Sequence, residues 1–161
     1  MKSLCLSAAL VVAATAVQAQ SVIFGAGYAD YSEDTADDLA IFSVEYQHAP
    51  FYEATRLSAT WGAALTVDTD GDTHVGVGLV GAYSFADRWF AELSVMPGYY
   101  NAANDLNDLG GNFQIRSLLG VGYSLDNGNK ISLAVTHKSN ASTDDPNPGV
   151  NAFFLRYHLG F

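Results

Sequence analysis

Apolar residues occupy every second position along most of this chain of 161 residues. Eight stretches carry the pattern, over Val22–Tyr31, Ala40–His48, Arg56–Val67, Val75–Phe85, Trp89–Val95, Phe113–Tyr123, Ile131–Ser139 and Phe153–Phe161. A period of two sends successive side chains to opposite faces of a β-strand, and no stretch shows the sustained spacing of an amphipathic helix. The sequence therefore predicts an all-β fold of eight strands.

The N-terminal segment is of a different kind. Lys2 gives a short positive start, an apolar run from Leu4 to Val17 follows, and small residues around Ala19 suit a signal peptidase. The run is shorter than the about 20 residues that a transmembrane helix needs, which disfavours the alternative of an N-terminal membrane anchor. We expect residues 1–19 to be a signal peptide and residues 20–161 to be the mature domain.

The composition excludes several classes of function. Seventeen acidic residues against seven basic ones give a formal net charge of −10, which is the wrong sign for a surface that binds nucleic acid. The single cysteine, Cys5, excludes a disulfide framework and a cysteine-based zinc site. The 49% of hydrophobic residues fits either a soluble core or a membrane-facing surface, so this value does not decide between them.

The two faces of the predicted strands favour a membrane barrel over a soluble sandwich. The face opposite each apolar stripe is small, polar or charged, as in the narrow interior of a small barrel. Strands of about ten residues match the tilted span of a bilayer. Aromatic residues gather near strand ends, as in interfacial girdles, and the chain ends at Phe161 in a strand that resembles the assembly signal of outer-membrane barrels. We therefore expect an eight-stranded antiparallel transmembrane β-barrel of the bacterial outer membrane. Its interior charges are expected to form an ion-pair network: Glu45, Glu92, Arg116 and Arg156.

The connections predict which end of the barrel faces outward. Short turns at Ala49–Tyr52, Ala86–Arg88 and Asp126–Asn129 alternate with the longer segments Ser32–Leu39, Asn101–Asn112 and Asn140–Val150, with Thr69–Thr73 as a short exception. In outer-membrane barrels the short turns are periplasmic and the long loops are extracellular.

Most of the acidic residues lie at this predicted outer rim: Asp30, Glu33, Asp34, Asp37, Asp38, Asp68, Asp70, Asp72, Asp105, Asp108, Asp144 and Asp145. They fit a solvated face, or alternatively a surface that bridges divalent cations to lipopolysaccharide phosphates. The segment from Asp68 to Asp72 superficially suggests calcium, but its glycine is misplaced for an EF-hand and no glutamate closes it. We therefore predict no metal site there.

One strand breaks the apolar pattern. On the lipid-facing parity of the seventh strand, the apolar residues from Ile131 to Val135 are followed by His137 and Ser139. A polar pair is costly against hydrocarbon, so it lies near the interface or serves a function. Residues i and i+2 share one face of a strand at a spacing of about 6.5–7 Å, so the two side chains can approach each other. Such a pair is the minimum for an activated serine nucleophile, although an interfacial polar pair is the commoner explanation.

The residues around this pair resemble a known family. His137-Lys-Ser139-Asn140-Ala141, followed by Asn147-Pro148-Gly149-Val150-Asn151, is similar to the signature of the PagL-type lipid A 3-O-deacylases. Those proteins are eight-stranded outer-membrane barrels with a serine-esterase site on the lipid-facing wall. The resemblance implies that His137 is the general base, that Ser139 is the nucleophile, and that Asn140 helps to form the oxyanion hole.

Asn151 is the position where this chain departs from the family. The family usually has a glutamate there to orient the histidine, and the parity of Asn151 places it on the same wall as His137 and Ser139. An amide oxygen can accept an imidazole N–H, but it cannot offset the charge of an imidazolium. Three alternatives follow: activity is reduced, Asn151 suffices, or Asp144 or Asp145 substitutes from the loop.

The resemblance implies a serine esterase that hydrolyses the ester-linked 3-O acyl chain of lipid A in the outer leaflet. Lipopolysaccharide is then the substrate, the membrane lipids are the other partners, and no metal or organic cofactor is required. The competing hypothesis is a non-enzymatic eight-stranded barrel with a structural or adhesion role, which would not need His137 and Ser139 on a lipid-facing stripe. A pore is disfavoured because side chains fill the interior of an eight-stranded barrel. A homodimer stays open.

Overall fold

The computed structural model describes residues 20–31 and 39–161. Its strands are β1 (Ser21–Tyr31), β2 (Leu39–Gln47), β3 (Tyr52–Glu53), β4 (Leu57–Asp68), β5 (Thr73–Ser84), β6 (Trp89–Asn101), β7 (Phe113–Ser124), β8 (Lys130–Ser139) and β9 (Val150–Gly160), and a short 3-10 helix, η1, spans Asp105–Asn107. Residues 1–19 and 32–38 lie outside the described residues. The signal peptide expected over residues 1–19 and the long loop expected between the first two strands therefore stay predictions.

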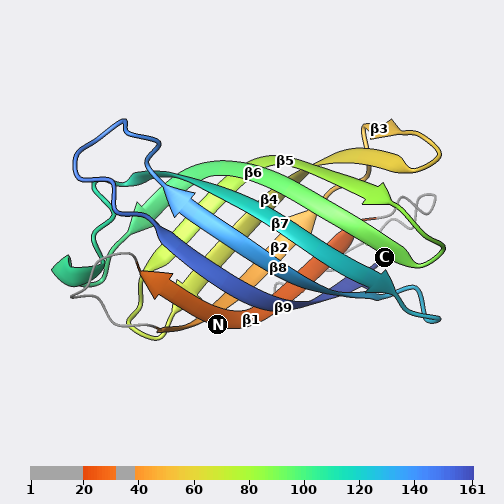
Figure 1. Ribbon diagram of the computed structural model, residues 1–161, viewed down its shortest axis with the longest axis horizontal. Coiled ribbons are helices and arrows are strands. Elements are labelled where there is room, and N and C mark those ends of the chain that lie inside the picture. Colours follow the sequence, from red (N-terminus) through yellow and green to blue (C-terminus); the bar gives the residue numbers. More distant parts are fainter. Residues whose placement is uncertain (1–19, 32–38) are drawn as a thin grey trace, which may run out of the picture.

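The eight long strands form a closed antiparallel barrel (Figure 1). Strands that follow each other in the chain pair with each other, β2 pairs with β4, and β1 closes the barrel by pairing with β9. Closure lets every spanning strand satisfy its backbone hydrogen bonds on both sides, which the hydrocarbon of a bilayer demands. Among the described residues, no helix has the length and apolar character to cross a membrane. The predicted eight-stranded barrel is confirmed.

Two elements differ from the sequence-based expectation. The turn expected at Ala49–Tyr52 is part of a longer excursion, because the two-residue strand β3 folds back and pairs with β4. Strand β6 extends beyond its predicted end at Val95, although it contains Pro97, which has no N–H to give to a ladder. The register between β5 and β6 skips Met96 and Pro97 and resumes at Gly98, while Pro97 keeps its partner Ile115 on β7. The proline therefore interrupts one pairing without ending the strand.

The outer wall of the barrel is apolar over the middle of the strands. On β8 and β9, Leu133 is 67% exposed, Phe153 56% and Leu155 62%, while the residues beside each of them in the chain are buried. In a membrane these exposed side chains contact lipid tails. The expected division between a lipid-facing stripe and an inward-facing stripe is therefore present.

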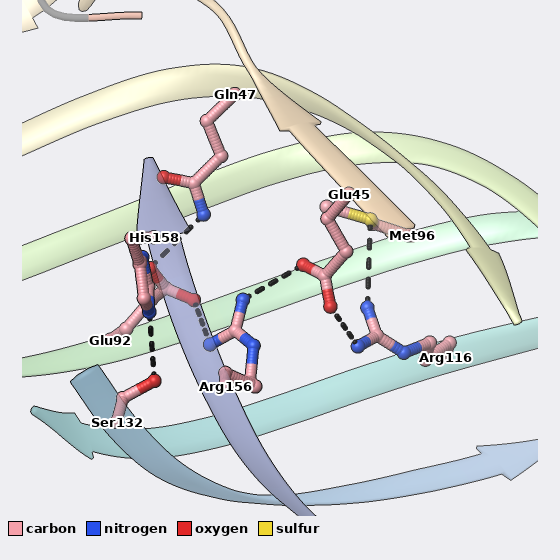
Figure 2. Close-up of polar contacts among 8 residues, drawn as sticks. All are labelled: Glu45, Gln47, Glu92, Met96, Arg116, Ser132, Arg156 and His158. Carbon is pink, nitrogen blue, oxygen red and sulfur yellow. Dashed lines mark hydrogen bonds and ion pairs between the residues drawn. The ribbon is translucent and has the colours of Figure 1, made fainter. Parts of the chain in front are cut away.

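The inside of the barrel holds the predicted ion-pair network (Figure 2). Glu45 accepts hydrogen bonds from Arg116 at 2.6 Å and from Arg156 at 2.9 Å, and Arg156 also donates to Glu92 at 2.7 Å. All four side chains are at most 3% exposed. Buried ions are tolerated when their charges are paired in this way. The network ties β2, β6, β7 and β9 together across the interior, as the sequence predicted.

The two ends of the barrel differ in their connections. Gln20 and Phe161 exchange backbone hydrogen bonds of 3.3 and 3.0 Å, and they lie at the end that carries the short turns, on the right in Figure 1. The loops after β4, β6 and β8 lie together at the opposite end, on the left. The ends of β8 and β9 that carry Ser139 and Asn151 are at this long-loop end.

The short loop from Asp68 to Asp72 is closed by its own hydrogen bonds. Asp68 Oδ1 accepts the backbone N–H of Asp72 at 2.9 Å. The hydroxyl of Tyr31 lies between the two carboxylates, 2.8 Å from Asp68 Oδ2 and 2.9 Å from Asp72 Oδ2, and can donate its one hydrogen to either. Asn107 of η1 donates to Asp72 at 2.6 Å. In the part of the chain that the structure describes, no group of three or more His, Cys, Asp or Glu side chains is placed to hold a metal ion. The two carboxylates therefore serve the loop contacts.

Candidate active site on the outer wall of the barrel

The outward face of β8 changes character near the end of the strand. The apolar stripe that reaches Val135 continues with exposed His137 and then with half-buried Ser139, the last residue of β8. Lys138, between them, points into the barrel, where its Nζ lies 4.5 Å from the centre of the Tyr100 ring. The structure thus places His137 and Ser139 on one outward face, at the end of the barrel that carries the long loops.

Asn151 lies beside His137 on the neighbouring strand β9. The two residues are partners in the β8–β9 register, and the side-chain oxygen of Asn151 lies 2.9 Å from Nδ1 of His137. A carbonyl oxygen only accepts hydrogen bonds, so Nδ1 carries the proton, and Nε2 of the neutral ring keeps its lone pair. This tautomer is the one that a general base needs.

Gly149 lies against the imidazole of His137, and its lack of a side chain leaves space for the ring. Its φ of 73° lies in the left-handed region, which glycine adopts without steric cost. A Cβ at this position would stand 3.1 Å from Cε1 and 3.6 Å from Nε2 of His137. The loop that leads into β9 therefore packs directly against the ring, and a larger residue would crowd it.

His137 and Ser139 share a face without a hydrogen bond between them in the described residues. Their backbone positions are about 6.5–7 Å apart along the strand. Catalytic hydrogen bonds are often long or poorly aligned in a free enzyme and tighten only when substrate is bound. The structure thus brings the histidine and the serine to one face and brings the asparagine into contact with the histidine.

Asn140 is directed into the loops. Its side chain is fully buried; Nδ2 donates to the carbonyl oxygens of Gly110 at 2.7 Å and Pro146 at 3.0 Å, and Oδ1 accepts the N–H of Ser142 at 2.8 Å. These bonds join the β8–β9 loop to the β6–β7 loop. The backbone N–H of Asn140 donates to Oδ1 of Asn147 at 3.0 Å. The side chain is thus occupied by structural contacts, and the backbone N–H is the group of Asn140 that suits an oxyanion.

The two loop aspartates form no hydrogen bond or ion pair with His137 in the described residues. Asp144 faces the β6–β7 loop, because its Oδ2 lies 2.7 Å from the place that a Cβ on Gly111 would take. Its Oδ1 accepts the N–H of Asp145 at 2.9 Å, and both aspartates are exposed. The group that the structure brings to Nδ1 of His137 is Asn151.

Near the site lies a further acidic residue, Asp30, which the sequence alone does not single out. Asp30 of β1 pairs with Asn151 in the β1–β9 register. From the sequence, Asp30 is one of many rim acids, and its parity shows only that it faces outward. Its neighbour on the next strand becomes known only from the closure of the barrel.

An apolar groove of about 540 Å³ lies on the outer wall, between the site and the middle of the barrel. Residues of β1, β7, β8 and β9 line it, including Tyr28, Leu119, Leu133, Val135, Phe153 and Leu155. Val135 lies two residues before His137, and Phe153 lies two residues after Asn151, each on the same strand face as that site residue. The groove therefore begins directly beside His137 and Asn151.

The profile of the lipid A 3-O-deacylase (PagL) family matches residues 40–160 of the chain. The chain belongs to this family. Its function is accordingly that of a lipid A deacylase, which hydrolyses the 3-O-linked acyl ester of lipid A, and lipid A is its substrate. The comparisons contain nothing that favours the alternative of a non-enzymatic barrel.

Solved structures support the fold of the deacylase. The crystal structure of the outer membrane enzyme PagL matches with a TM-score of 0.70 at 19% identity, over 88% of this chain and 99% of that chain. A de novo designed transmembrane β-barrel matches at 0.59 and 12% identity, over 91% and 98%, and Neisserial surface protein A at 0.53 and 10%, over 89% and 96%. No match was found among the curated proteins. Fold and family together indicate the outer membrane of a Gram-negative bacterium.

Proposed function

We propose that the deacylase is a serine esterase in which Ser139 is the nucleophile, His137 the general base and Asn151 the residue that orients His137. The observation that carries the proposal is the hydrogen bond of 2.9 Å between Asn151 Oδ1 and His137 Nδ1 on the outward face of the barrel. This bond selects the tautomer with a free Nε2, and Nε2 is the atom that has to accept the proton of Ser139.

In the first half-reaction, Ser139 Oγ attacks the carbonyl carbon of the 3-O-linked acyl ester while His137 Nε2 takes the hydroxyl proton. The tetrahedral intermediate collapses when the bond between the acyl carbon and the sugar oxygen breaks. The imidazolium returns its proton to that oxygen. The products are lipid A with a free 3-hydroxyl and an acyl ester on Ser139.

In the second half-reaction, water replaces the sugar hydroxyl. His137 takes a proton from the water as its oxygen attacks the acyl carbonyl, and then protonates Ser139 Oγ as the ester bond breaks. The acyl chain leaves as a free fatty acid, and the enzyme returns to its starting state. Both half-reactions use the chain's own residues and water.

Asn151 supplies orientation without charge. In a serine protease, changing the triad aspartate to asparagine lowers turnover by about 10⁴, largely because the histidine adopts the wrong tautomer. Here the bond from Nδ1 to Oδ1 already selects the right tautomer. The deficit that remains is electrostatic, because an amide does not offset the charge of the imidazolium. We therefore expect a working esterase of low turnover.

The backbone after Ser139 is suited to stabilise the oxyanion. The N–H of Asn140 donates to the amide oxygen of Asn147, and a negatively charged oxygen is a stronger acceptor that would replace it. Ala141 and Ser142 follow with φ of 54° and 61°. Such values are uncommon for residues with side chains, and strained backbone of this kind clusters at functional sites.

The position of the groove supports a site that faces the outer leaflet. An acyl chain that lies in the groove runs along the apolar wall toward the middle of the barrel. The sugar then stays level with His137 and the long loops, which are extracellular in outer-membrane barrels. Because every side chain of the proposed site comes from one chain, catalysis does not require the homodimer that the sequence leaves open.

The proposed mechanism is tested by mass spectrometry of lipid A incubated with the purified barrel. The unmodified chain should remove the mass of one ester-linked acyl group, and Ser139→Ala and His137→Ala should each remove none. Ser124→Ala, at the opposite end of the neighbouring strand, is the matched control and should keep full activity. Activity in Ser139→Ala would refute the serine mechanism, and heat-dependent gel mobility shows whether each variant retains a folded barrel.

A further inference from the structure

Asp30 lies in the same row of outward-facing residues as Asn151 and His137. The β1–β9 register pairs Asp30 with Asn151, and the β8–β9 register pairs Asn151 with His137. Asp30 is exposed between buried Ala29 and buried Tyr31, so its side chain is on the outward face. Residues directly opposite each other on antiparallel strands have Cβ atoms about 4.5–5.5 Å apart. The row is therefore continuous across β1, β9 and β8.

Asn151 has unused hydrogen-bonding capacity. Its oxygen accepts from His137, and its amide nitrogen carries two N–H donors, neither of which forms a hydrogen bond within the described residues. The carboxylate of Asp30 can only accept, and it too has no hydrogen bond or ion pair in residues 20–31 and 39–161. Donor and acceptor are thus neighbours in one row, at the level where the lipid-facing wall turns polar.

We propose that Asp30 is a positioning residue that acts on His137 through the amide of Asn151. In the reacting enzyme the carboxylate would accept an N–H of Asn151, a bond that the described residues do not form in the free structure, and so hold the amide oxygen toward Nδ1. Its charge favours the imidazolium that forms when Ser139 loses its proton. The inference rests on the proposed function of the other three residues. It means that the carboxylate missing from position 151 is supplied by the neighbouring strand.

Within residues 20–31 and 39–161, few other charges face His137. The outward residues beside it on β7 and β9 are uncharged: Ile115, Ser117, Asn151 and Phe153. The loop after β8 adds Asp144, which is turned toward Gly111, and exposed Asp145. Lys138 lies inside the barrel. Asp30 is therefore the charge that the sheet register itself aligns with the imidazole.

The spacing gives the size of the expected effect. Two strand spacings separate the Asp30 carboxylate from the imidazole, so the distance between the two groups is about 9–10 Å. At an effective dielectric constant of about 20, a unit charge at this distance changes an equilibrium roughly tenfold. The distance is close to the screening length of about 10 Å in 0.1 M salt, so added salt should reduce the effect.

The test compares Asp30→Asn with Asp105→Asn, a matched loss of one exposed carboxylate from η1 at the same end of the barrel. Asp30→Asn should lower kcat about tenfold with little change in KM. The acid limb of its pH profile should move to lower pH, because the imidazolium loses a stabilising charge. Asp30→Glu should restore most of the activity, and Asp105→Asn should leave kcat and the pH profile unchanged.

A double-mutant cycle tests whether Asp30 acts through Asn151. In an Asn151→Ala background, Asp30→Asn should have a smaller effect, because the connecting amide is absent and only the long-range action of the charge remains. If Asp30→Asn lowers kcat equally in the unmodified chain and in Asn151→Ala, the proposal is overturned. It is also overturned if the kcat and pH profile of Asp30→Asn match those of Asp105→Asn. Asp30→Ser gives a second removal of the charge if Asp30→Asn does not fold. Failure of the proposed function would show separately, as activity that survives Ser139→Ala.

Discussion

Gly149 lies directly against the imidazole of His137, where a methyl group would stand closer than ordinary van der Waals contact. A Cβ there would stand 3.1 Å from Cε1 of His137 and 3.2 Å from the carbonyl oxygen of Lys138, at a φ of 73°. We expect Gly149→Ala to lower kcat at least about tenfold, because misplacing a catalytic group by about 1 Å can cost about 10² in rate. Steady-state release of fatty acid from lipid A measures this.

Gly128→Ala is the control for that variant. Gly128 has a similar φ of 84°, but no atom lies within 4 Å of the place its Cβ would take. The substitution therefore brings the same backbone strain without a steric contact, at the end of the barrel away from the site. An equal loss of activity in both variants would mean that strain, not crowding of His137, is responsible.

Asn151→Glu should raise turnover, and Asn151→Ala should lower it. A carboxylate at this position would accept from Nδ1 and also offset the imidazolium charge, so we expect a gain of roughly tenfold, the size of one well-placed charge at moderate dielectric. Alanine removes the acceptor that selects the tautomer. Assays of both variants on purified lipid A measure the two effects, and a neutral Asn151→Ala would show that another group orients His137.

Asp144→Ala and Asp145→Ala should each leave kcat within about twofold, since exposed surface substitutions away from a special contact are usually close to neutral. In the structure, Asp144 faces Gly111 and Asp145 is exposed. The same lipid A assay decides the point. An essential aspartate at either position would move the orienting role from Asn151 to the loop, while leaving His137 and Ser139 in place.

Arg156→Met should destabilise the barrel without changing the chemistry of the site. Arg156 pairs with both Glu45 and Glu92, so its loss leaves buried carboxylates short of a partner. Breaking a buried pair from one side typically costs about 3–5 kcal/mol. Urea unfolding of the refolded barrel measures the loss. Arg88→Met, which removes an exposed ion pair with Asp126, should leave the unfolding midpoint nearly unchanged.

The alternation of the sequence predicts the strands well because a small membrane barrel has two chemically opposed faces. Lipid selects large apolar side chains such as Leu133 and Leu155, and the interior selects paired charges such as Glu45 and Arg156. The same parity places His137, Ser139 and Asn151 on one wall, as the structure has them. The alternation does not predict strand β3, since two residues are too few to show a period.

Other features depend on register and loop packing, which a pattern along one strand does not contain. Asp30 becomes the neighbour of Asn151 only because β1 pairs with β9 in one particular register. Asn140 follows Ser139 directly, yet its side chain turns into the loops because buried carbonyl groups of the β6–β7 loop need donors. These carbonyls lie about thirty residues away in the chain, so nothing near Asn140 in the sequence predicts the contact.

The pairing of β1 with β9 joins the first spanning strand of the chain to the last. Asp30 and one side of the apolar groove belong to β1, whereas His137, Ser139 and Asn151 belong to β8 and β9. An unfinished barrel therefore has neither a complete groove nor a complete row of polar residues. For this reason we expect lipid A deacylation to begin only when β1 has paired with β9.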